Sequence, residues 1–209
     1  MSSNPFDFFD KITCINLNIR KDRWAQSLIQ FKTVGIDTRV ERFEAVLNEE
    51  VPTKGFYDSL MGVIEEARDS NAENLLSLED DVVFEEDIQT NLTKAIYQLP
   101  KDWGLFFLGC NIVAEAKKIS PNILQLEQAY ATHAMAINSN LFDYMLNEST
   151  RGPALDVWIS ENIIANKYKP CYAMYPIGAV QRDSYSNIEK RFTTYTHFKP
   201  RYENHSTKE

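Results

Sequence analysis

Three consecutive carboxylates interrupt an apolar segment in the middle of the chain. Residues 75–84 read LLSLEDDVVF, so Glu79, Asp80 and Asp81 stand between two apolar runs. Adjacent anions repel one another and are costly to bury, and a cation relieves both costs. Hard oxygen ligands suit Mg²⁺ or Mn²⁺, which take one or two carboxylates and fill the remaining positions with phosphate oxygens. The alternative is an exposed strand end whose acids are solvated or cap the next helix.

The order of side chains in an extended chain predicts how this triplet is presented. Successive side chains point to opposite faces of a strand, so we expect Glu79 and Asp81 on one face and Asp80 on the other. Two arginines, Arg20 and Arg23, follow another apolar segment at residues 12–17. Guanidinium groups at such a strand end can hold a diphosphate or stack on a base. The alternative for this pair is a solvated basic helix start.

Strands and helices are expected to alternate around these charged residues. Apolar runs predict strands at 12–17, 38–43, 75–84, 103–109, 123–126 and 134–137, and helical spacing predicts helices at 21–34, 55–70, 87–99, 138–147 and 154–165. The chain from Tyr168 onward is expected to be irregular. This order predicts an α/β fold with a mostly parallel sheet, in which ligands bind beyond the carboxyl ends of the strands.

Composition narrows the class of protein. The 209 residues carry 22 Lys and Arg against 30 Asp and Glu, a formal net charge of -8, which argues against a protein that coats duplex nucleic acid. A local basic pocket is still compatible with that balance. No segment approaches the roughly 20 apolar residues of a membrane helix, and no secretory signal is evident. Cys14, Cys110 and Cys171 lie in apolar surroundings and are interpreted as reduced core residues of a cytoplasmic protein.

Short motifs recur along most of the chain in a recognisable order. They are Ile15-Asn16-Leu17, Arg20 with Arg23, Arg42-Phe43 with Ala45-Val46, the Gly55-led helix with Ser59, Leu78-Glu79-Asp80-Asp81-Val82, Asp102-Trp103 through Leu108-Gly109, Ala154-Leu155-Asp156, Pro176, Gln181 and Ser186-Asn187-Ile188. In this set the chain resembles glycosyltransferase family 25, which contains lipopolysaccharide-type and collagen galactosyltransferases. The resemblance runs from about residue 12 to residue 188.

The resemblance implies a GT-A type fold in one domain, residues 1–209. About 11–110 would bind a nucleotide sugar, and about 111–200 would form an acceptor-binding half and a C-terminal lid. It further implies a UDP-sugar donor, transfer of a hexose such as galactose or glucose with inversion, and a Mn²⁺ or Mg²⁺ ion held by Glu79 and Asp81. The donor-binding residues expected from this comparison and from the charges near the strand ends are Asn16, Leu17, Arg20, Arg23, Ser59, Asp80, Gln181, Lys190 and Arg191.

Asp156 is the candidate catalytic base. Inverting transfer needs one base, opposite the leaving group, to take the proton of the acceptor hydroxyl. Asp156 begins the helix expected at 154–165. The alternative is an acid that stabilises the helix dipole. Trp158, two residues later, is either a platform for a sugar or part of the core.

The histidines and the C-terminal segment carry weaker expectations. His197 would complete the metal shell if the tail folds back over the donor, and an exposed tail histidine is the alternative. His133 is expected to be structural, and His205 has no expected role. Lys190 and Arg191, with Lys199 and Arg201, are interleaved with aromatic residues. Such a segment can form a lid over the donor, contact a nucleic-acid acceptor, or be simply amphipathic.

Two positions depart from the family pattern, and they keep other functions in consideration. Leu60 stands where the family usually has histidine, and Asn187 where it has aspartate. A catalytically silent nucleotide- or glycan-binding module is therefore one alternative. A nucleotidyltransferase is another, although the chain lacks a glycine-rich phosphate loop. The acceptor (a glycan, a protein hydroxyl or a modified nucleic-acid base) and the oligomeric state are not predicted.

Overall fold

The computed structural model describes residues 4–149, 152, 154–186 and 190–194. Its main sheet has the strand order β2-β1-β3-β8-β5-β9-β7-β6. These strands are β1 (Lys11–Asn16), β2 (Val40–Glu44), β3 (Asn74–Glu79), β5 (Leu105–Ile112), β6 (Lys117–Ser120), β7 (Ile123–Gln125), β8 (Ala129–Asn138) and β9 (Cys171–Met174). Two small antiparallel pairs accompany the sheet: β4 (Val82–Phe84) with β10 (Ala179–Gln181), and β11 (Ser184–Ser186) with β12 (Arg191–Thr193).

Most strands of the main sheet run in one direction. β1 pairs in parallel with β2 and β3, and β5 pairs in parallel with β9. β8 and β7 are the strands that run the other way, since β8 is antiparallel to β3 and β5, and β7 is antiparallel to β9 and β6. The predicted α/β fold with a mostly parallel sheet is therefore confirmed.

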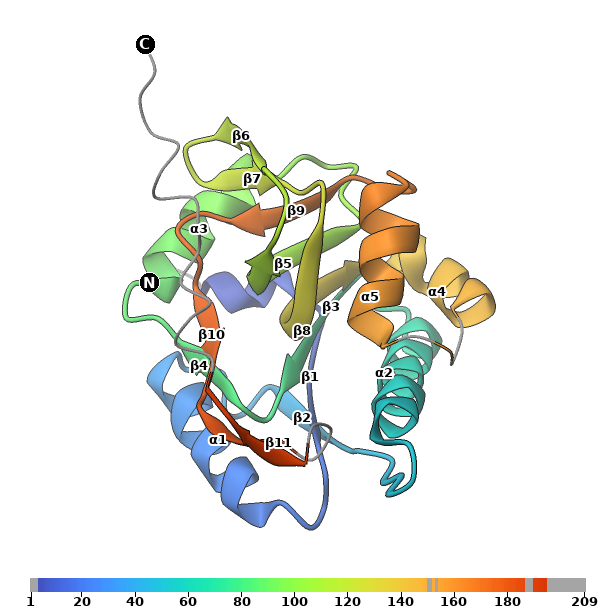
Figure 1. The fold of residues 1–209 in the computed structure, drawn as a ribbon. Coiled ribbons are helices and arrows are strands. Elements are labelled where there is room, and N and C mark those ends of the chain that lie inside the picture. The colour runs from blue at the N-terminus through green and yellow to red at the C-terminus, as the bar shows by residue number, and fades with distance from the viewer. Residues whose placement is uncertain (1–3, 150–151, 153, 187–189, 195–209) are drawn as a thin grey trace.

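Helices cover both faces of the sheet (Figure 1). They are η1 (Pro5–Phe8), α1 (Lys21–Thr33), α2 (Pro52–Asp69), α3 (Ile88–Gln98), η2 (Ser139–Leu141), α4 (Phe142–Glu148), α5 (Leu155–Ile159) and the π-helical turn η3 (Ser160–Ala165). Helices α2, α4 and α5 bury their apolar sides in one core, and η1, α1 and α3 bury theirs in another. This alternation of strand and helix is what gives a parallel sheet two covered faces.

Local sequence explains the first β–α unit. The apolar strand β1 is buried along almost its full length, and α1 turns Phe31 into the core beneath the sheet. Gly35 follows the helix with φ of +70°, a left-handed conformation that is easy only for glycine, and so it ends α1 as the sequence predicted.

The chain after Tyr168 is more regular than the sequence suggested. β9 pairs with β5 and β7 inside the main sheet, and β10 pairs with β4 beside it. The prediction of an irregular end is therefore wrong for these residues. The strands are three or four residues long, which is too short for a periodic pattern to be visible in the sequence.

Gly109 is required where β10 passes over β5. A Cβ atom at this position would lie 2.0 Å from the Ala179 carbonyl oxygen and 2.4 Å from Nε2 of His133. The backbone of β10 can therefore approach β5 only because residue 109 has no side chain. Gly178 N also donates to Leu108 O at 2.8 Å, which fixes the approach.

Two further features of the fold are the state of the three cysteines and the length of the described helices. Cys14, Cys110 and Cys171 are buried and free, as predicted, and burial raises the pKa of each thiol. In the part of the chain that the structure describes, no helix has the length and apolar character needed to cross a bilayer.

Candidate functional site

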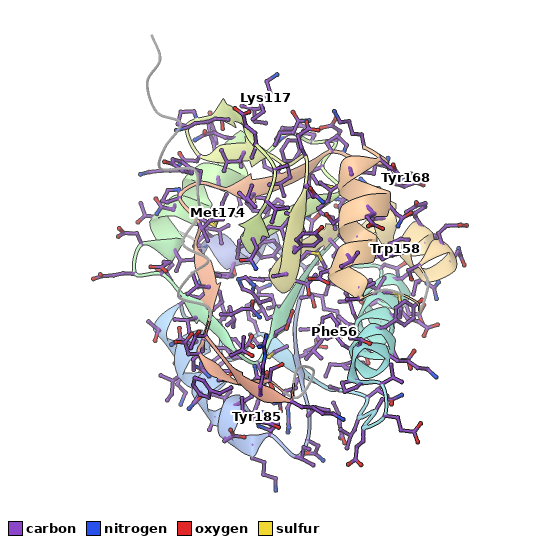
Figure 2. The ribbon with its side chains drawn as sticks, viewed as in Figure 1. Phe56, Lys117, Trp158, Tyr168, Met174 and Tyr185 are labelled. Carbon is purple, nitrogen blue, oxygen red and sulfur yellow. The ribbon has the colours of Figure 1, made fainter. Side chains whose placement is uncertain are left out.

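A pocket of about 1000 Å³ opens at the sheet edge where β1 and β3 end. Because β1, β3 and β5 point the same way, their carboxyl ends meet at this edge, and the antiparallel β8 begins there. Helix α5 presents its first turn to the same space, and the segment before α2 closes another side. Phe56 and Tyr185, which line the pocket from α2 and β11, are labelled in Figure 2. Ligands of α/β sheets bind at such an edge.

A tight turn carries two of the three consecutive acids. β3 ends at Glu79, and Asp80 and Asp81 form the turn into β4. Both turn carboxylates contact one guanidinium: Arg23 Nε lies 2.9 Å from Asp80 Oδ1, and Arg23 Nη2 lies 2.5 Å from Asp81 Oδ2. The predicted alternation, with Asp80 facing away from Asp81, is therefore wrong, because the extended strand ends one residue earlier than that argument needs.

Asn16 supports this turn from the end of β1. Its Nδ2 donates to Asp80 Oδ2 at 2.5 Å and to the Arg20 carbonyl at 3.2 Å. Its Oδ1 accepts from Nε and Nη2 of Arg42 on β2, at 2.9 and 2.5 Å. Asn16 is only 1 % exposed. The residue expected to bind the donor thus has its amide engaged in holding Asp80, and no part of it lines the pocket.

Glu79 has a different environment from its two neighbours. Its Oε1 accepts from the Thr132 hydroxyl of β8 at 2.8 Å. Burial first, and then the negative charge of Asp81, raise the pKa of Glu79 to about 8. The pKa of Asp80 is also raised, by burial, although Arg23 and Asn16 oppose that shift. The site therefore favours the protonated form of Glu79, beside two aspartates that both contact Arg23.

The three acids do not fit a divalent ion in this arrangement. One oxygen of Asp80 accepts from Asn16 and the other lies in ion-pair contact with Arg23 Nε, which makes no hydrogen bond among the described residues, and one oxygen of Asp81 pairs with Arg23 Nη2. The other, Asp81 Oδ1, is buried and has no hydrogen-bond partner among the described residues. Those residues also contain no cluster of three His, Cys, Asp or Glu side chains placed to hold a metal. The predicted Mn²⁺ or Mg²⁺ stays a prediction, and binding it would require Arg23 to move.

Asp156 lines the pocket from the first turn of α5. Its Oδ2 accepts from the Ala131 amide at 3.3 Å, and its Oδ1 accepts from the Val157 amide at 2.9 Å. Ala131 has φ of +67°, so Asp156 is linked to a left-handed kink at the start of β8. No ion pair joins Asp156 to a described Lys or Arg. The Asp156 carboxylate therefore faces the pocket in an orientation that backbone amides fix.

All but one of the remaining predicted donor residues line the pocket, and the exception is Arg20. The lining residues are Leu17, Ser59, Gln181, Lys190 and Arg191. Of these, Ser59 is fully buried, and its Oγ donates to Gly55 O at 2.7 Å and accepts from Val46 N at 2.8 Å, so it holds the pocket wall.

Lys190 and Arg20 reach across to neighbouring segments. Lys190 Nζ donates to Glu49 O at 3.3 Å. The Arg20 side chain is not part of the lining: it pairs with Asp22 at 3.0 Å and donates to Tyr185 O at 3.2 Å. Arg20 therefore anchors β11 to the start of α1, beside the pocket and outside it.

Several other expectations can now be placed. His133 is 3 % exposed, its Nε2 lies 3.2 Å from Ala179 O, and burial lowers its pKa, in agreement with a structural role. Trp158 lies in the core beside Tyr144, and the pocket lining does not include it. Leu60 is buried on the core side of α2. Asn187, His197, His205, Lys199 and Arg201 lie outside the described residues.

Sequence reasoning missed the residues that support the acids. Thr132 holds Glu79, Arg42 holds Asn16, and the backbone amide of Arg182 donates to Asp81 O at 2.8 Å. Arg42 belonged to a motif quoted for the resemblance, but nothing in its spacing indicated a role. Thr132 and Arg182 become neighbours of the acids only through the pairing of β8 with β3 and of β10 with β4.

The fold is similar to that of two solved structures, one of which is a glycosyltransferase. One is "a glycosyltransferase involved in the glycosylation of the major capsid of PBCV-1", with a TM-score of 0.52, 13 % identity and coverage of 86 % of this chain and 96 % of that one. Another is A197 from STIV, with a TM-score of 0.52, 12 % identity and coverage of 82 % and 85 %. No family model matches the chain, and no curated protein matches its sequence. The fold is thus of the GT-A-like class, and identities this low establish the fold alone.

Proposed function

We propose that this protein is a glycosyltransferase that moves a sugar from a nucleoside-diphosphate sugar to a hydroxyl acceptor. One observation carries the proposal: a single pocket at the carboxyl edge of a GT-A-like sheet holds a cation-paired acidic turn on one wall and Asp156 on the other. A volume of about 1000 Å³ lies at the upper end of the usual range for small-molecule sites. It suits a bulky donor together with part of an acceptor.

The walls of the pocket suggest how the donor lies. Leu17, Ala45 and Val46 give apolar surface near the ends of β1 and β2, which suits a base and ribose. Arg23 lies beside them at the acidic turn, and its positive charge suits the diphosphate. The sugar would then extend toward Asp156.

Asp156 is the proposed base for an inverting reaction. As the acceptor oxygen bonds to the anomeric carbon, the bond from that carbon to the diphosphate oxygen breaks, and its electron pair leaves with the diphosphate. The hydroxyl proton passes to the Asp156 carboxylate. The backbone amides of Ala131 and Val157 fix that carboxylate in one orientation, so it needs little reorganisation during the step.

The finer features of the donor follow the resemblance described above. We propose UDP as the nucleotide and galactose or glucose as the hexose. The acceptor class is left to the assay, because the pocket residues do not select among a glycan, a protein hydroxyl and a modified base. The resemblance also predicts Mn²⁺ or Mg²⁺ held by Glu79 and Asp81, whereas these acids do not fit a divalent ion while Arg23 is paired with the turn, so every assay is run with Mn²⁺ and with EDTA.

The test is a donor panel. The protein is incubated with UDP-galactose, UDP-glucose, GDP-mannose and UDP-N-acetylglucosamine, and release of free nucleotide is measured. We expect slow hydrolysis of at least one donor, stimulated by a hydroxyl acceptor, with loss of turnover in Asp156→Asn. Binding of nucleotide sugars without turnover in any condition would identify a silent binding module instead. Absence of binding at millimolar donor would refute the proposal.

A further inference from the structure

The acidic turn already contains a cation supplied by the chain itself. We propose that Arg23 takes the part expected of a metal ion: it pairs with Asp80 and Asp81 and contacts the diphosphate of the donor, so that nucleotide binding does not require a divalent cation. This inference rests on the proposed function, because it concerns the same donor.

The position of Arg23 is defined from several sides. It lies in the first turn of α1, which packs against the β3–β4 turn, and the Ser27 hydroxyl one turn later donates to the Asp80 carbonyl at 2.8 Å. Its side chain is only 12 % exposed, and those of Asp80 and Asp81 are 10 % and 6 % exposed. An ion pair this well enclosed is screened little by salt and is costly to separate.

The guanidinium also has capacity beyond the two aspartates. It contacts them through Nε and Nη2, and Nη1 is the nitrogen that neither carboxylate takes. A guanidinium carries five N–H donors in one plane, so one edge can serve carboxylates while another meets a phosphate. Arg23 lines the pocket, which places its remaining donors where a diphosphate would enter.

A metal ion would have to compete with this arrangement. The carboxylate oxygen of the turn that has no partner among the described residues, Asp81 Oδ1, is buried, so a cation arriving through the pocket does not meet it first. Oε1 of Glu79 already accepts from the Thr132 hydroxyl at 2.8 Å, so a metal ion bound through that oxygen would have to displace this hydrogen bond. A divalent ion beside Arg23 would also be repelled by a like charge at close range.

The segment at the start of β12 adds positive charge to the pocket without a metal. Lys190 and Arg191 line the same pocket, Lys190 from the residue before β12 and Arg191 from its first position. A diphosphate between these two side chains and Arg23 would lie among cationic groups from two separate segments of the chain. Such a cluster can share the charge that develops on the leaving diphosphate.

Calorimetric titration of the full chain with UDP, with GDP in parallel, tests the inference. Each titration is run in EDTA and again with Mn²⁺, and uridine serves as the ligand that lacks the diphosphate. We expect the UDP affinity in EDTA to lie within about threefold of that in Mn²⁺. Arg23→Gln should weaken UDP binding by about 10–100-fold, the range for one charge-assisted contact, and change uridine binding less than about twofold.

Arg68→Gln is the matched control, since it removes the same charge from α2, where Arg68 pairs with exposed acids. If Arg23→Gln does not fold, the double variant Arg23→Gln/Asp81→Asn, which restores the charge balance, replaces it. UDP binding in that variant should be as weak as expected for the single change. The wild-type comparison of EDTA with Mn²⁺ needs no variant at all.

The outcomes separate this inference from the proposed function. UDP binding that disappears in EDTA and returns with Mn²⁺ would overturn the role of Arg23 and leave the glycosyltransferase proposal intact. UDP affinity in Arg23→Gln equal to that in Arg68→Gln would do the same. Absence of nucleotide binding in every condition would overturn both.

Discussion

The two walls of the pocket carry carboxylates in opposite states. On the β3 wall, Asp80 and Asp81 are buried and share one guanidinium, with Asn16 supporting the pair from behind. On the α5 wall, Asp156 is partly exposed and accepts only from backbone amides. The acids of one wall are paired with a cationic side chain, and the acid of the other wall faces the pocket without such a partner among the described residues.

This difference assigns separate tasks to acids that look alike in the sequence. A carboxylate held by a guanidinium in an enclosed ion pair loses that pair when it is protonated. A carboxylate with fixed orientation and no cation partner is suited to general base work. We therefore expect the β3 wall to control donor binding and stability, and the α5 wall to control turnover.

The largest effect should come from Asp156→Asn. The amide oxygen can still accept from a backbone N–H, so folding should be nearly unchanged, whereas loss of the base should lower kcat by about 10²–10⁴-fold. Steady-state assays of transfer and thermal unfolding measure the two effects. Asp143→Asn, in the first turn of α4 and away from the pocket, is the control. Equal loss of transfer in both variants would assign Asp156 to a helix-capping role.

The next effect concerns the ion pair of the β3 wall. Arg23→Gln leaves two buried carboxylates without their cation, so the free energy of unfolding should fall by about 3–5 kcal/mol. Arg23→Gln/Asp81→Asn should recover at least about 1 kcal/mol of that loss. Urea denaturation measures both, with Arg68→Gln expected within about 0.5 kcal/mol of wild type. An Arg23→Gln protein as stable as wild type would contradict the enclosed ion pair.

The pH dependence of stability should reveal Glu79. Its folded-state pKa of about 8 lies above the ordinary 4.5, so the folded protein binds the proton more tightly than the unfolded chain does. Stability from this group is complete below about pH 4.5, is lost as the pH rises toward 8, and then levels off. A shift of this size corresponds to a loss on the order of 5 kcal/mol. In Glu79→Gln, the free energy of unfolding should vary less with pH between about pH 5 and 9 than it does in the wild type. If the pH dependence is unchanged, it arises from other groups.

The smallest effect should be that of Ser59→Ala. The hydroxyl joins α2 to the Val46 segment through two hydrogen bonds, so its removal should cost about 1 kcal/mol. UDP affinity should change less than twofold if Ser59 acts only on the wall. Calorimetry and urea denaturation measure both quantities, and Ser70→Ala at the end of α2 is the control. A tenfold loss of affinity with unchanged stability would instead place Ser59 against the donor.

The sequence predicted the secondary structure well in the first part of the chain, where a strand is repeatedly followed by a helix. The first strands and helices, from β1 to α3, have apolar spacing that is long enough to read, and they lie close to the predicted ranges. The acidic triplet was also found from sequence, because three acids between apolar runs are unusual in any fold. Its position at a sheet edge followed from the strand before it.

The contacts of the three acids could not be predicted from the sequence. The β3–β4 turn is only two residues long, and the residue types of Glu79, Asp80 and Asp81 do not indicate at which of them the strand ends. Thr132 meets Glu79 through an antiparallel strand that comes from the second half of the chain. Arg23 was expected to contact phosphate, and its pairing with Asp80 and Asp81 depends on how α1 packs against the sheet. Local patterns identify charged residues, whereas tertiary packing decides which of them pair.

Gly109 lets one position outside the pocket govern its acidic wall. The close passage of β10 over that glycine sets the distance between β10 and β5. β10 pairs with β4, and the backbone amide of Arg182, the residue after β10, donates to Asp81 O. A methyl group at residue 109 would lift β10 and pull the acidic turn with it. Donor affinity could thus be tuned, or lost, by a change that touches none of the residues lining the cavity.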